Sequence, residues 1–159
     1  MKAIFLSLVI SSICFGQIPN GTYRLEKIMC STGKKLKLGG KFMQYQVDLK
    51  INDNLMNMTA IAKSAKWAPF KLKCTQKNEG KFSIRSNKTY EGYLQLSHVE
   101  CNAKMWEGIL KKHAFGVEEQ GTFTYAISGK KLTIENPKTV TKYSCKKTGG
   151  YPIYHYNKL

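Results

Sequence analysis

Apolar and polar residues alternate with a period of two along most of this chain, and that period constrains the fold more than any other sequence feature. In the clearest case, segment 43–51, Met, Tyr, Val, Leu and Ile occupy the odd positions and polar residues the even ones. Successive side chains of a strand point to opposite faces of a sheet, so this pattern predicts an antiparallel strand with one buried face.

Similar patterns and turn residues recur at short intervals. They predict further strands at about 22–30, 55–62, 70–74, 82–84, 91–101, 123–127, 132–134, 139–145 and 151–156. Asp53-Asn54, Asn78-Glu79-Gly80 and Ser128-Gly129 are predicted to be turns. A helical spacing of apolar residues predicts one short helix in the connection 102–120, whose shared face carries Met105, Trp106, Ile109, Leu110 and His113.

Eight to ten short strands joined by tight turns favour an all-β fold, a single up-and-down antiparallel β-barrel, because closing the sheet removes its exposed edges. A β-sandwich is the alternative. No repeat or linker divides the chain, so we expect one domain over residues 17–159.

Residues 1–16 have the pattern of a signal peptide. Lys2 is followed by an apolar stretch at 4–13, and Cys14-Phe15-Gly16 offers small residues at the positions that a signal peptidase reads. The pattern predicts cleavage before Gln17 and secretion to an extracellular or periplasmic compartment. A membrane anchor and a lipoprotein acylated on Cys14 are the alternatives.

Four cysteines remain after such cleavage: Cys30, Cys74, Cys101 and Cys145. An even number of cysteines in an exported chain indicates two disulfides. A zinc site is the competing interpretation, although no pair has C-x-x-C spacing. We expect no bound metal and no cofactor.

Lysine dominates the charge of the chain. The formal net charge is +16, from 26 basic and 10 acidic residues, and only Arg24 and Arg85 among the basic residues are arginine. Such an excess favours anionic partners.

In a meander, successive loops alternate between the two barrel ends, which assigns the lysines to ends. Loops 31–41, 63–68, 86–90, 128–131 and 146–150 then share one end and hold eleven lysines with no acidic residue. Loops 53–54, 77–80, 102–120 and 136–139 share the other end and are balanced in charge. The eleven lysines are Lys34, Lys35, Lys37, Lys41, Lys63, Lys66, Lys88, Lys130, Lys131, Lys146 and Lys147.

The same assignment favours a disulfide connectivity. Cys30 and Cys145 fall at the lysine-rich end, whereas Cys74 and Cys101 fall at the balanced end. Opposite ends of a strand lie roughly 20 Å apart, too far for a disulfide, whose Cα atoms are within about 7 Å. We therefore expect Cys30–Cys145 and Cys74–Cys101, with one strand between the strands of the second pair.

Two segments resemble lipocalin-like (calycin-type) proteins. Gly21-Thr22-Tyr23 opens the first strand as the Gly-x-Trp motif does in lipocalins, and 122–134 is similar to the late hairpin of small bacterial lipocalin-like proteins. Tyr23 takes the place of the tryptophan. Lys142 or Lys158 would then take the place of the arginine that packs on it.

The resemblance implies a ligand site inside the barrel, because the loop after the first strand lies at the open mouth in lipocalins. We expect a small amphipathic anion to be held there, with its apolar part inside and its carboxylate or phosphate at the lysines. Small Ala60 and Ala62 would leave space for it. The expected interior residues are Tyr45, Val47, Met58 (or Met56), Phe123, Tyr125 and Ile127. The expected anion-binding rim is Lys34, Lys35, Lys37, Lys66, Lys130, Lys131, Lys146 and Lys147.

Other functions stay open at this point. The barrel could be filled by its own side chains. The lysine-rich loops could bind polyanionic surfaces such as nucleic acid, lipopolysaccharide or acidic polysaccharide, without sequence-specific recognition. A secreted nuclease-type hydrolase using His98 and Glu100, with His155 and Arg85 available, is the enzymatic alternative, but no catalytic motif accompanies these residues, and we expect a non-enzymatic protein. We also expect a monomer without a transmembrane segment.

Overall fold

A computed structural model describes residues 17–37, 41–86, 88–112, 121–135, 145 and 150–159. Nine strands and one helix form there. In chain order they are β1 (Gly21–Cys30), β2 (Lys35–Leu36), β3 (Met43–Asn52), β4 (Leu55–Ser64), β5 (Lys73–Ser86), β6 (Thr89–Cys101), α1 (Lys104–Lys112), β7 (Gly121–Ser128), β8 (Lys131–Glu135) and β9 (Pro152–Lys158). The leader 1–16 and most of the strand predicted at 139–145 lie outside the described residues.

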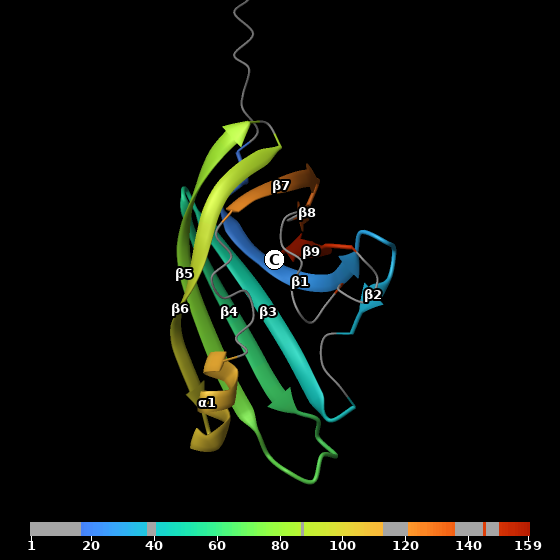
Figure 1. Ribbon diagram of the computed structural model, residues 1–159, viewed down its shortest axis with the longest axis vertical. Helices are drawn as coiled ribbons and strands as arrows, with labels where there is room; N and C mark the ends of the chain where they lie inside the picture. Colours follow the sequence, from blue (N-terminus) through green and yellow to red (C-terminus); the bar gives the residue numbers. More distant parts are fainter. Residues whose placement is uncertain (1–16, 38–40, 87, 113–120, 136–144, 146–149) are drawn as a thin grey trace, which may run out of the picture.

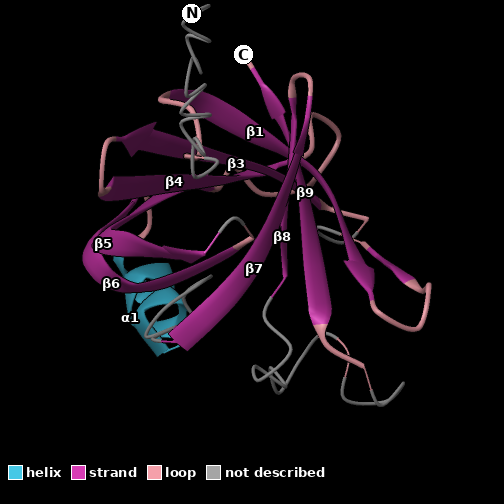
Figure 2. Cartoon of the chain, turned by 90° about the horizontal axis from the view of Figure 1, so that it is seen from above, coloured by secondary structure: helices cyan, strands magenta, loops and turns pink. Residues whose placement is uncertain are grey.

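The strands form a closed, eight-stranded antiparallel barrel, as the period-two pattern predicts. The sheet order is β2-β1-β3-β4-β5-β6-β7-β8-β9, and β1 also pairs with β9, which closes it (Figure 2). The two-residue β2 pairs with β1 beside this seam. The predicted short helix is α1, within the expected connection. The expected barrel with one short helix is therefore confirmed.

Closure is confined to one part of the sheet. We name the two ends of the barrel after β1, which begins at the Gly21 end and finishes at the Cys30 end. β1 pairs with β3 over 21–24, and β6 pairs with β7 over 89–92, both toward the Gly21 end. Beyond these ladders β3, β4, β5 and β6 continue together toward the Cys30 end, where α1 lies against them (Figure 1).

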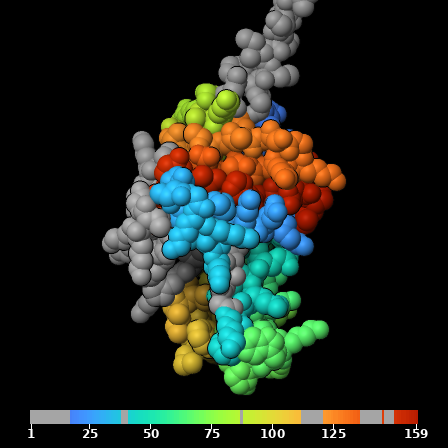
Figure 3. Space-filling view, turned by 90° about the vertical axis from the view of Figure 1, so that its right-hand side faces the viewer, coloured from blue at the N-terminus to red at the C-terminus, as the bar shows by residue number. Residues whose placement is uncertain are grey.

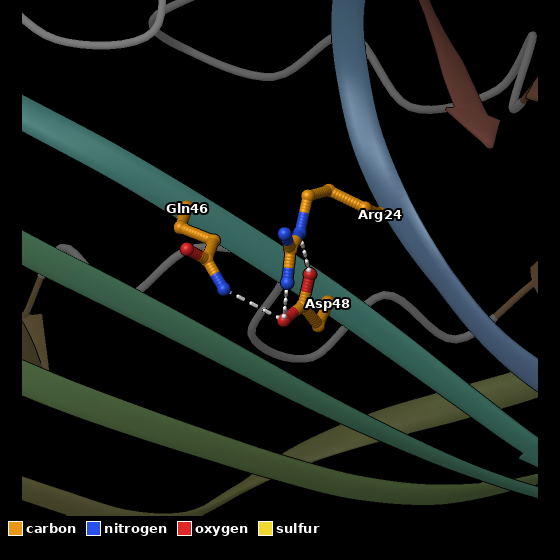
Figure 4. A network of polar contacts seen from close by, with 3 residues as sticks. All are labelled: Arg24, Gln46 and Asp48. Carbon is orange, nitrogen blue, oxygen red and sulfur yellow. Dashed lines mark hydrogen bonds and ion pairs between the residues drawn. The ribbon is translucent and has the colours of Figure 1, made fainter. Parts of the chain in front are cut away.

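An ion pair on the outer surface marks the point where β1 and β3 separate. Arg24 and Asp48 are opposed in the β1–β3 ladder, and Arg24 Nε and Nη2 donate to the two Asp48 carboxylate oxygens at 2.8 and 3.0 Å (Figure 4). Gln46 Nε2 donates to Asp48 Oδ2 at 2.9 Å. The Arg24 hydrogen bonds hold the pKa of the Asp48 carboxyl below its usual range.

The main hydrophobic core fills the closed part of the barrel. It includes large side chains from every long strand, among them Tyr23, Ile51, Met58, Tyr90 and Leu132, all at most 3% exposed. Such close packing stabilises the closed part and leaves little room within it.

Lys158 lies where the lipocalin resemblance calls for a cation. Its Nζ atom is 5.9 Å from the centroid of the Tyr23 ring, and the two residues are opposed in the β1–β9 ladder. The Tyr23 hydroxyl donates to the Pro19 carbonyl at 2.6 Å. Of the two expected lysines, Lys142 lies outside the described residues.

The strand β5 corrects one sequence prediction. Asn78-Glu79-Gly80, predicted to be a turn, lies inside a continuous 14-residue strand, and 70–72 precedes that strand rather than belonging to it. Asn78 is fully buried and accepts a 2.7 Å hydrogen bond from Gln76 Nε2. The β5–β6 register shifts after Lys77, and at Gly80 a Cβ atom would overlap the Tyr93 carbonyl oxygen. Within the strand, Asn78 therefore belongs to a buried amide pair at a bulge, and Gly80 allows the backbones of β5 and β6 to approach closely.

Merging two predicted strands into one moves the loops at 86–90, 102–120 and 128–131 to the opposite end. Loop 86–90 and turn 128–131 therefore lie at the Gly21 end, and connection 102–120 starts at the Cys30 end. The prediction of a single ring of eleven lysines is wrong for this reason.

Both expected disulfides form, although the geometry predicted for one of them is wrong. Cys30–Cys145 and Cys74–Cys101 have Cα–Cα distances of 5.7 and 4.1 Å. Cys74 and Cys101 are directly opposed on the adjacent strands β5 and β6, with no strand between them, and they lie at the Cys30 end. Disulfides of this kind are typical of proteins in oxidising compartments.

Candidate functional site

The inner face of the strand extension is arranged in transverse rows of side chains. One row runs Tyr45, Ala62, Cys74 and Cys101 across β3 to β6, and its neighbour toward the core runs Val47, Ala60, Gln76 and Val99. The next row brings Leu49, Met58 and Asn78 together. Along β4 the inward side chains therefore change from methionine, at 56 and 58, to alanine, at 60 and 62.

This change opens a cavity of about 380 Å³ at the Cys30 end. Its volume lies within the range of about 300–1,000 Å³ that small-molecule sites occupy. β3, β4, β5, the loop before β5 and α1 all contribute walls. The lining residues are Met43, Tyr45, Val47, Ala60, Ala62, Phe70, Leu72, Cys74, Gln76, Trp106, Ile109 and Leu110.

Hydrogen bonds at its start fix α1 over this cavity. Asn102 accepts from the Lys73 backbone N–H at 3.0 Å and donates from Nδ2 to the Lys71 carbonyl at 3.0 Å. Glu107 Oε1 accepts from the Cys101 backbone N–H at 3.1 Å. The end of β6 is thereby tied to the beginning of β5, and the helix is directed across the inner face.

The cavity is apolar along its walls and has one amide at its inner end. Gln76 is 4% exposed and directs Nε2 to Asn78. Trp106 and Ile109 are 37% and 43% exposed, so the α1 side of the cavity faces solvent.

Only part of the predicted interior lies at this cavity. Tyr45 and Val47 line it, next to the small Ala60 and Ala62, as expected. Met58, Phe123 and Tyr125 are instead buried in the main core, where burial raises the pKa of the Tyr125 phenol. Ile127 is 39% exposed near the end of β7.

The Tyr90 ring explains why Phe123 is not available to a ligand. It stacks on Phe123 with ring centroids 4.9 Å apart and an interplanar angle of 9°, and the Tyr125 centroid lies 6.1 Å away. The barrel interior is thus filled by its own side chains on this side, as the alternative of a filled interior proposed, whereas the inner face of the strand extension borders the cavity at the Cys30 end.

The predicted rim lysines are divided among three places. Lys66 is in the loop 65–72 beside the cavity, and Lys34, Lys35 and Lys37 lie in and around β2, apart from α1 (Figure 1). Lys130 and Lys131 lie at the opposite, Gly21 end, where the Lys158 backbone N–H donates to the Lys130 carbonyl at 2.7 Å. Lys146 and Lys147 lie outside the described residues.

Lysines outside the predicted rim belong to the elements that line the cavity. Lys71 and Lys73 flank the lining residue Leu72, and Lys104 and Lys111 belong to α1. The helical face was foreseen in part: Trp106, Ile109 and Leu110 line the cavity, but Met105 is 74% exposed. His113 lies outside the described residues.

The residues considered for catalysis are dispersed. His98 Nε2 lies 3.7 Å from Glu100 Oε2 on β6, and both side chains are mostly exposed. His155 is on β9, separated from β6 by β7 and β8 in the sheet order, and its Nδ1 lies 3.4 Å from Thr133 Oγ1. Arg85 pairs with Glu91.

Across the described ranges, no helix is long and apolar enough to cross a membrane. Comparisons of the chain with protein-family models and with curated protein sequences found no match. The assignment of function therefore depends on the geometry of the barrel and its cavity.

Proposed function

We propose that this protein binds a small amphipathic anion, whose apolar part lies in the cavity between the strand extension and α1. The observation that carries the proposal is the pair of alanines at 60 and 62, which replace the methionine pattern of β4 and leave an apolar cavity of about 380 Å³. A protein of this size would otherwise fill such a space, because a cavity in a core costs stability.

The charge of the cavity surroundings supports an anionic head group. Exposed lysines, including Lys66, Lys71 and Lys104, lie in the elements that form the mouth. A carboxylate or phosphate placed among them gains charge-assisted hydrogen bonds. Binding of polyanions without use of the cavity is the competing proposal.

Trp106 provides a direct test, because it lines the cavity and Trp67, the other tryptophan, does not. In a Trp67→Phe variant, Trp106 is the sole tryptophan. We expect its emission to change and saturate on titration with dodecanoate or dodecyl phosphate, and to respond more weakly to dodecanol, which lacks the charge. No saturable response to any of the three would overturn the proposal.

Ala60→Met extends the methionine pattern of β4 into the cavity and should abolish this response. Thr59→Met is the matched control, since it adds the same side chain on the other face of β4, opposite Asp48 and Lys77. Equal loss of binding in both variants would contradict the assignment of the cavity as the site. Native mass spectrometry of the purified protein would show whether an acidic lipid accompanies it.

The proposal also includes export of the protein and a relationship to lipocalin-like barrels. Export is supported by the two disulfides, cleavage before Gln17 rests on the sequence pattern of residues 1–16, and the mass of the protein recovered outside the cytoplasm tests both. A relationship to lipocalin-like barrels is supported by the eight-stranded closure and by Lys158 over Tyr23.

A further inference from the structure

Three aromatic side chains at the Cys30 end form an exposed cluster, which we call the aromatic tip: Phe42, Trp67 and Phe70. Their exposed fractions are 42%, 58% and 42%. The centroid of the Phe42 ring lies 5.0 Å from that of Trp67 and 6.5 Å from that of Phe70, at tilted angles. Large aromatic side chains bury most of their surface in ordinary folds, so an exposed cluster of three points to a contact surface.

The loop 65–72 is built to hold this cluster outward. Its small residues Ala65 and Ala68 are 4% and 6% exposed, whereas its aromatic residues face solvent. The Ser64 N–H donates to the Leu72 carbonyl at 2.8 Å and the Ala65 N–H donates to the Phe42 carbonyl at 2.8 Å. Exposure of the rings is therefore a property of an ordered loop that buries alanine in preference to tryptophan.

The two segments that carry the aromatic tip are rich in lysine and contain no acidic residue. Lys41, Lys63, Lys66, Lys71 and Lys73 are exposed, and segments 41–46 and 61–75 contain no Asp or Glu. Figure 3 shows these two segments and α1 gathered at the lower end of the molecule. Such a concentration of positive charge is complementary to an anionic surface.

Two of these lysines are placed against each other. Lys63 and Lys73 are directly opposed in the β4–β5 ladder, and like charges at opposed positions destabilise a sheet. An anionic surface that covers both side chains would relieve their repulsion.

We propose that the aromatic tip and its lysines dock on the surface of an anionic lipid bilayer. Tryptophan and phenylalanine favour the interface between lipid headgroups and acyl chains, and neighbouring lysines add attraction to anionic headgroups. Single-stranded nucleic acid is less well matched, because Lys41 Nζ lies over the Trp67 ring, 5.8 Å from its centroid, where a base would stack. The docking surface adjoins the cavity mouth through Phe70, which lines the cavity.

This inference goes beyond the proposed ligand binding and does not depend on it. In a Trp106→Phe variant, Trp67 is the sole tryptophan, so its emission reports on the aromatic tip alone. We expect vesicles of phosphatidylcholine with phosphatidylglycerol to shift that emission to shorter wavelength, and brominated lipid to quench it. Vesicles of phosphatidylcholine alone should give a much weaker response. Absence of the shift on the anionic vesicles would overturn docking through the tip.

Matched charge variants separate a docking surface from the net charge of the protein. Lys41→Gln/Lys63→Gln/Lys66→Gln should weaken vesicle binding on the order of a hundredfold. Lys88→Gln/Lys130→Gln/Lys131→Gln removes the same charge from exposed positions at the Gly21 end and should have a small effect. Equal weakening by both triple variants would contradict the proposal.

The aromatic contribution is tested by Trp67→Ser/Phe70→Ser in sedimentation with the anionic vesicles. We expect a loss of at least about tenfold, because two interfacial side chains are removed. Trp67 and Phe70 are 58% and 42% exposed, and an unchanged circular dichroism spectrum would confirm that the fold is retained. Vesicle binding as strong as that of the unaltered protein, with equal competition by heparin, would show a polyanion-binding surface instead and overturn the proposal. Failure of the dodecanoate titration with vesicle binding intact would overturn only the ligand proposal.

Discussion

Cys74 and Cys101 are opposed residues of neighbouring strands, with Cα atoms 4.1 Å apart, and their disulfide lies in the row of side chains that borders the cavity. It links β5 to β6 at the end where the sheet extends beyond the closed barrel. Cys30–Cys145 links the end of β1 to a residue 115 positions away in the chain.

The two disulfides should contribute unequally to stability. Cys74–Cys101 closes a sequence separation of 27 residues, whereas Cys30–Cys145 closes one of 115. The chain-entropy model then gives the longer link an advantage of about 1 kcal/mol, within totals of about 2–5 kcal/mol. Urea unfolding of Cys30→Ala/Cys145→Ala and Cys74→Ala/Cys101→Ala would measure both, and a larger loss for the Cys74 pair would contradict this ranking.

Two glycines should respond to alanine in opposite directions. At Gly80 a Cβ atom would overlap the Tyr93 carbonyl oxygen, so we expect Gly80→Ala to destabilise the protein by more than about 2 kcal/mol. At Gly108, in α1, nothing lies within 4 Å of the added atom. Gly108→Ala should stabilise by about 0.5–1 kcal/mol through helix propensity. Thermal or urea unfolding tests both, and a neutral Gly80→Ala would show that β5 and β6 separate easily there.

Asp48→Asn should destabilise the protein in a pH-dependent way. The hydrogen bonds from Arg24 lower the folded-state pKa of Asp48, so its contribution is present above the unfolded pKa and lost as the pH falls through the folded one. The difference in unfolding free energy between Asp48→Asn and the unaltered protein should therefore shrink in acid. Arg24→Gln/Asp48→Asn should cost less than the sum of the single variants, and strict additivity would show that the pair is not coupled.

His155 should make the folded state sensitive to mild acid. Burial lowers its pKa below 6.5, and the charge of Lys27, its opposed neighbour on β1, acts in the same direction. Glu26 and Glu135 raise the pKa and Lys131 lowers it, with smaller effects than burial. A lowered folded pKa means that the unfolded chain takes up the proton first, so stability falls as the pH drops below about 6.5.

The variant His155→Gln removes this titration. Relative to it, the unaltered protein should lose unfolding free energy between neutral pH and mild acid, as measured by urea unfolding at a series of pH values. Parallel pH profiles for the two proteins would assign the acid sensitivity to other groups.

The alternation of residues predicts the barrel, and the cysteine count with the strand order predicts which cysteines pair, but the placement of Cys74–Cys101 and of the lysines required the tertiary structure. Asn78-Glu79-Gly80 has the composition of a turn, and only the buried hydrogen bond to Gln76 and the close approach of Tyr93 explain why the strand continues through it. Because loop ends follow from the strand count, this one difference moved Lys88, Lys130 and Lys131 to the other end.

The candidate cavity was likewise foreseen only in part. Tyr45, Val47, Ala60 and Ala62 follow from the inward face of two strands, since the period of two identifies that face. The contribution of Phe70 and of Trp106 depends on where a loop and a helix dock, and local sequence patterns do not determine such long-range contacts. Helical spacing predicts the apolar face of α1, but it does not predict that this face packs over the inner face of β3, β4 and β5.

The confinement of closure to one part of the sheet has a consequence for dynamics and for evolutionary change. Backbone amides of β1, β8 and β9 that donate within the β1–β9 and β8–β9 ladders should exchange with solvent more slowly than those of β3 to β6 beyond the β1 and β7 ladders, which should exchange through smaller, local openings. Side chains in the strand extension lie apart from the β1–β9 seam that closes the barrel, so substitutions there should disturb that seam little. Under the proposed function, ligand preference and folding stability could therefore diverge separately among descendants of one such chain.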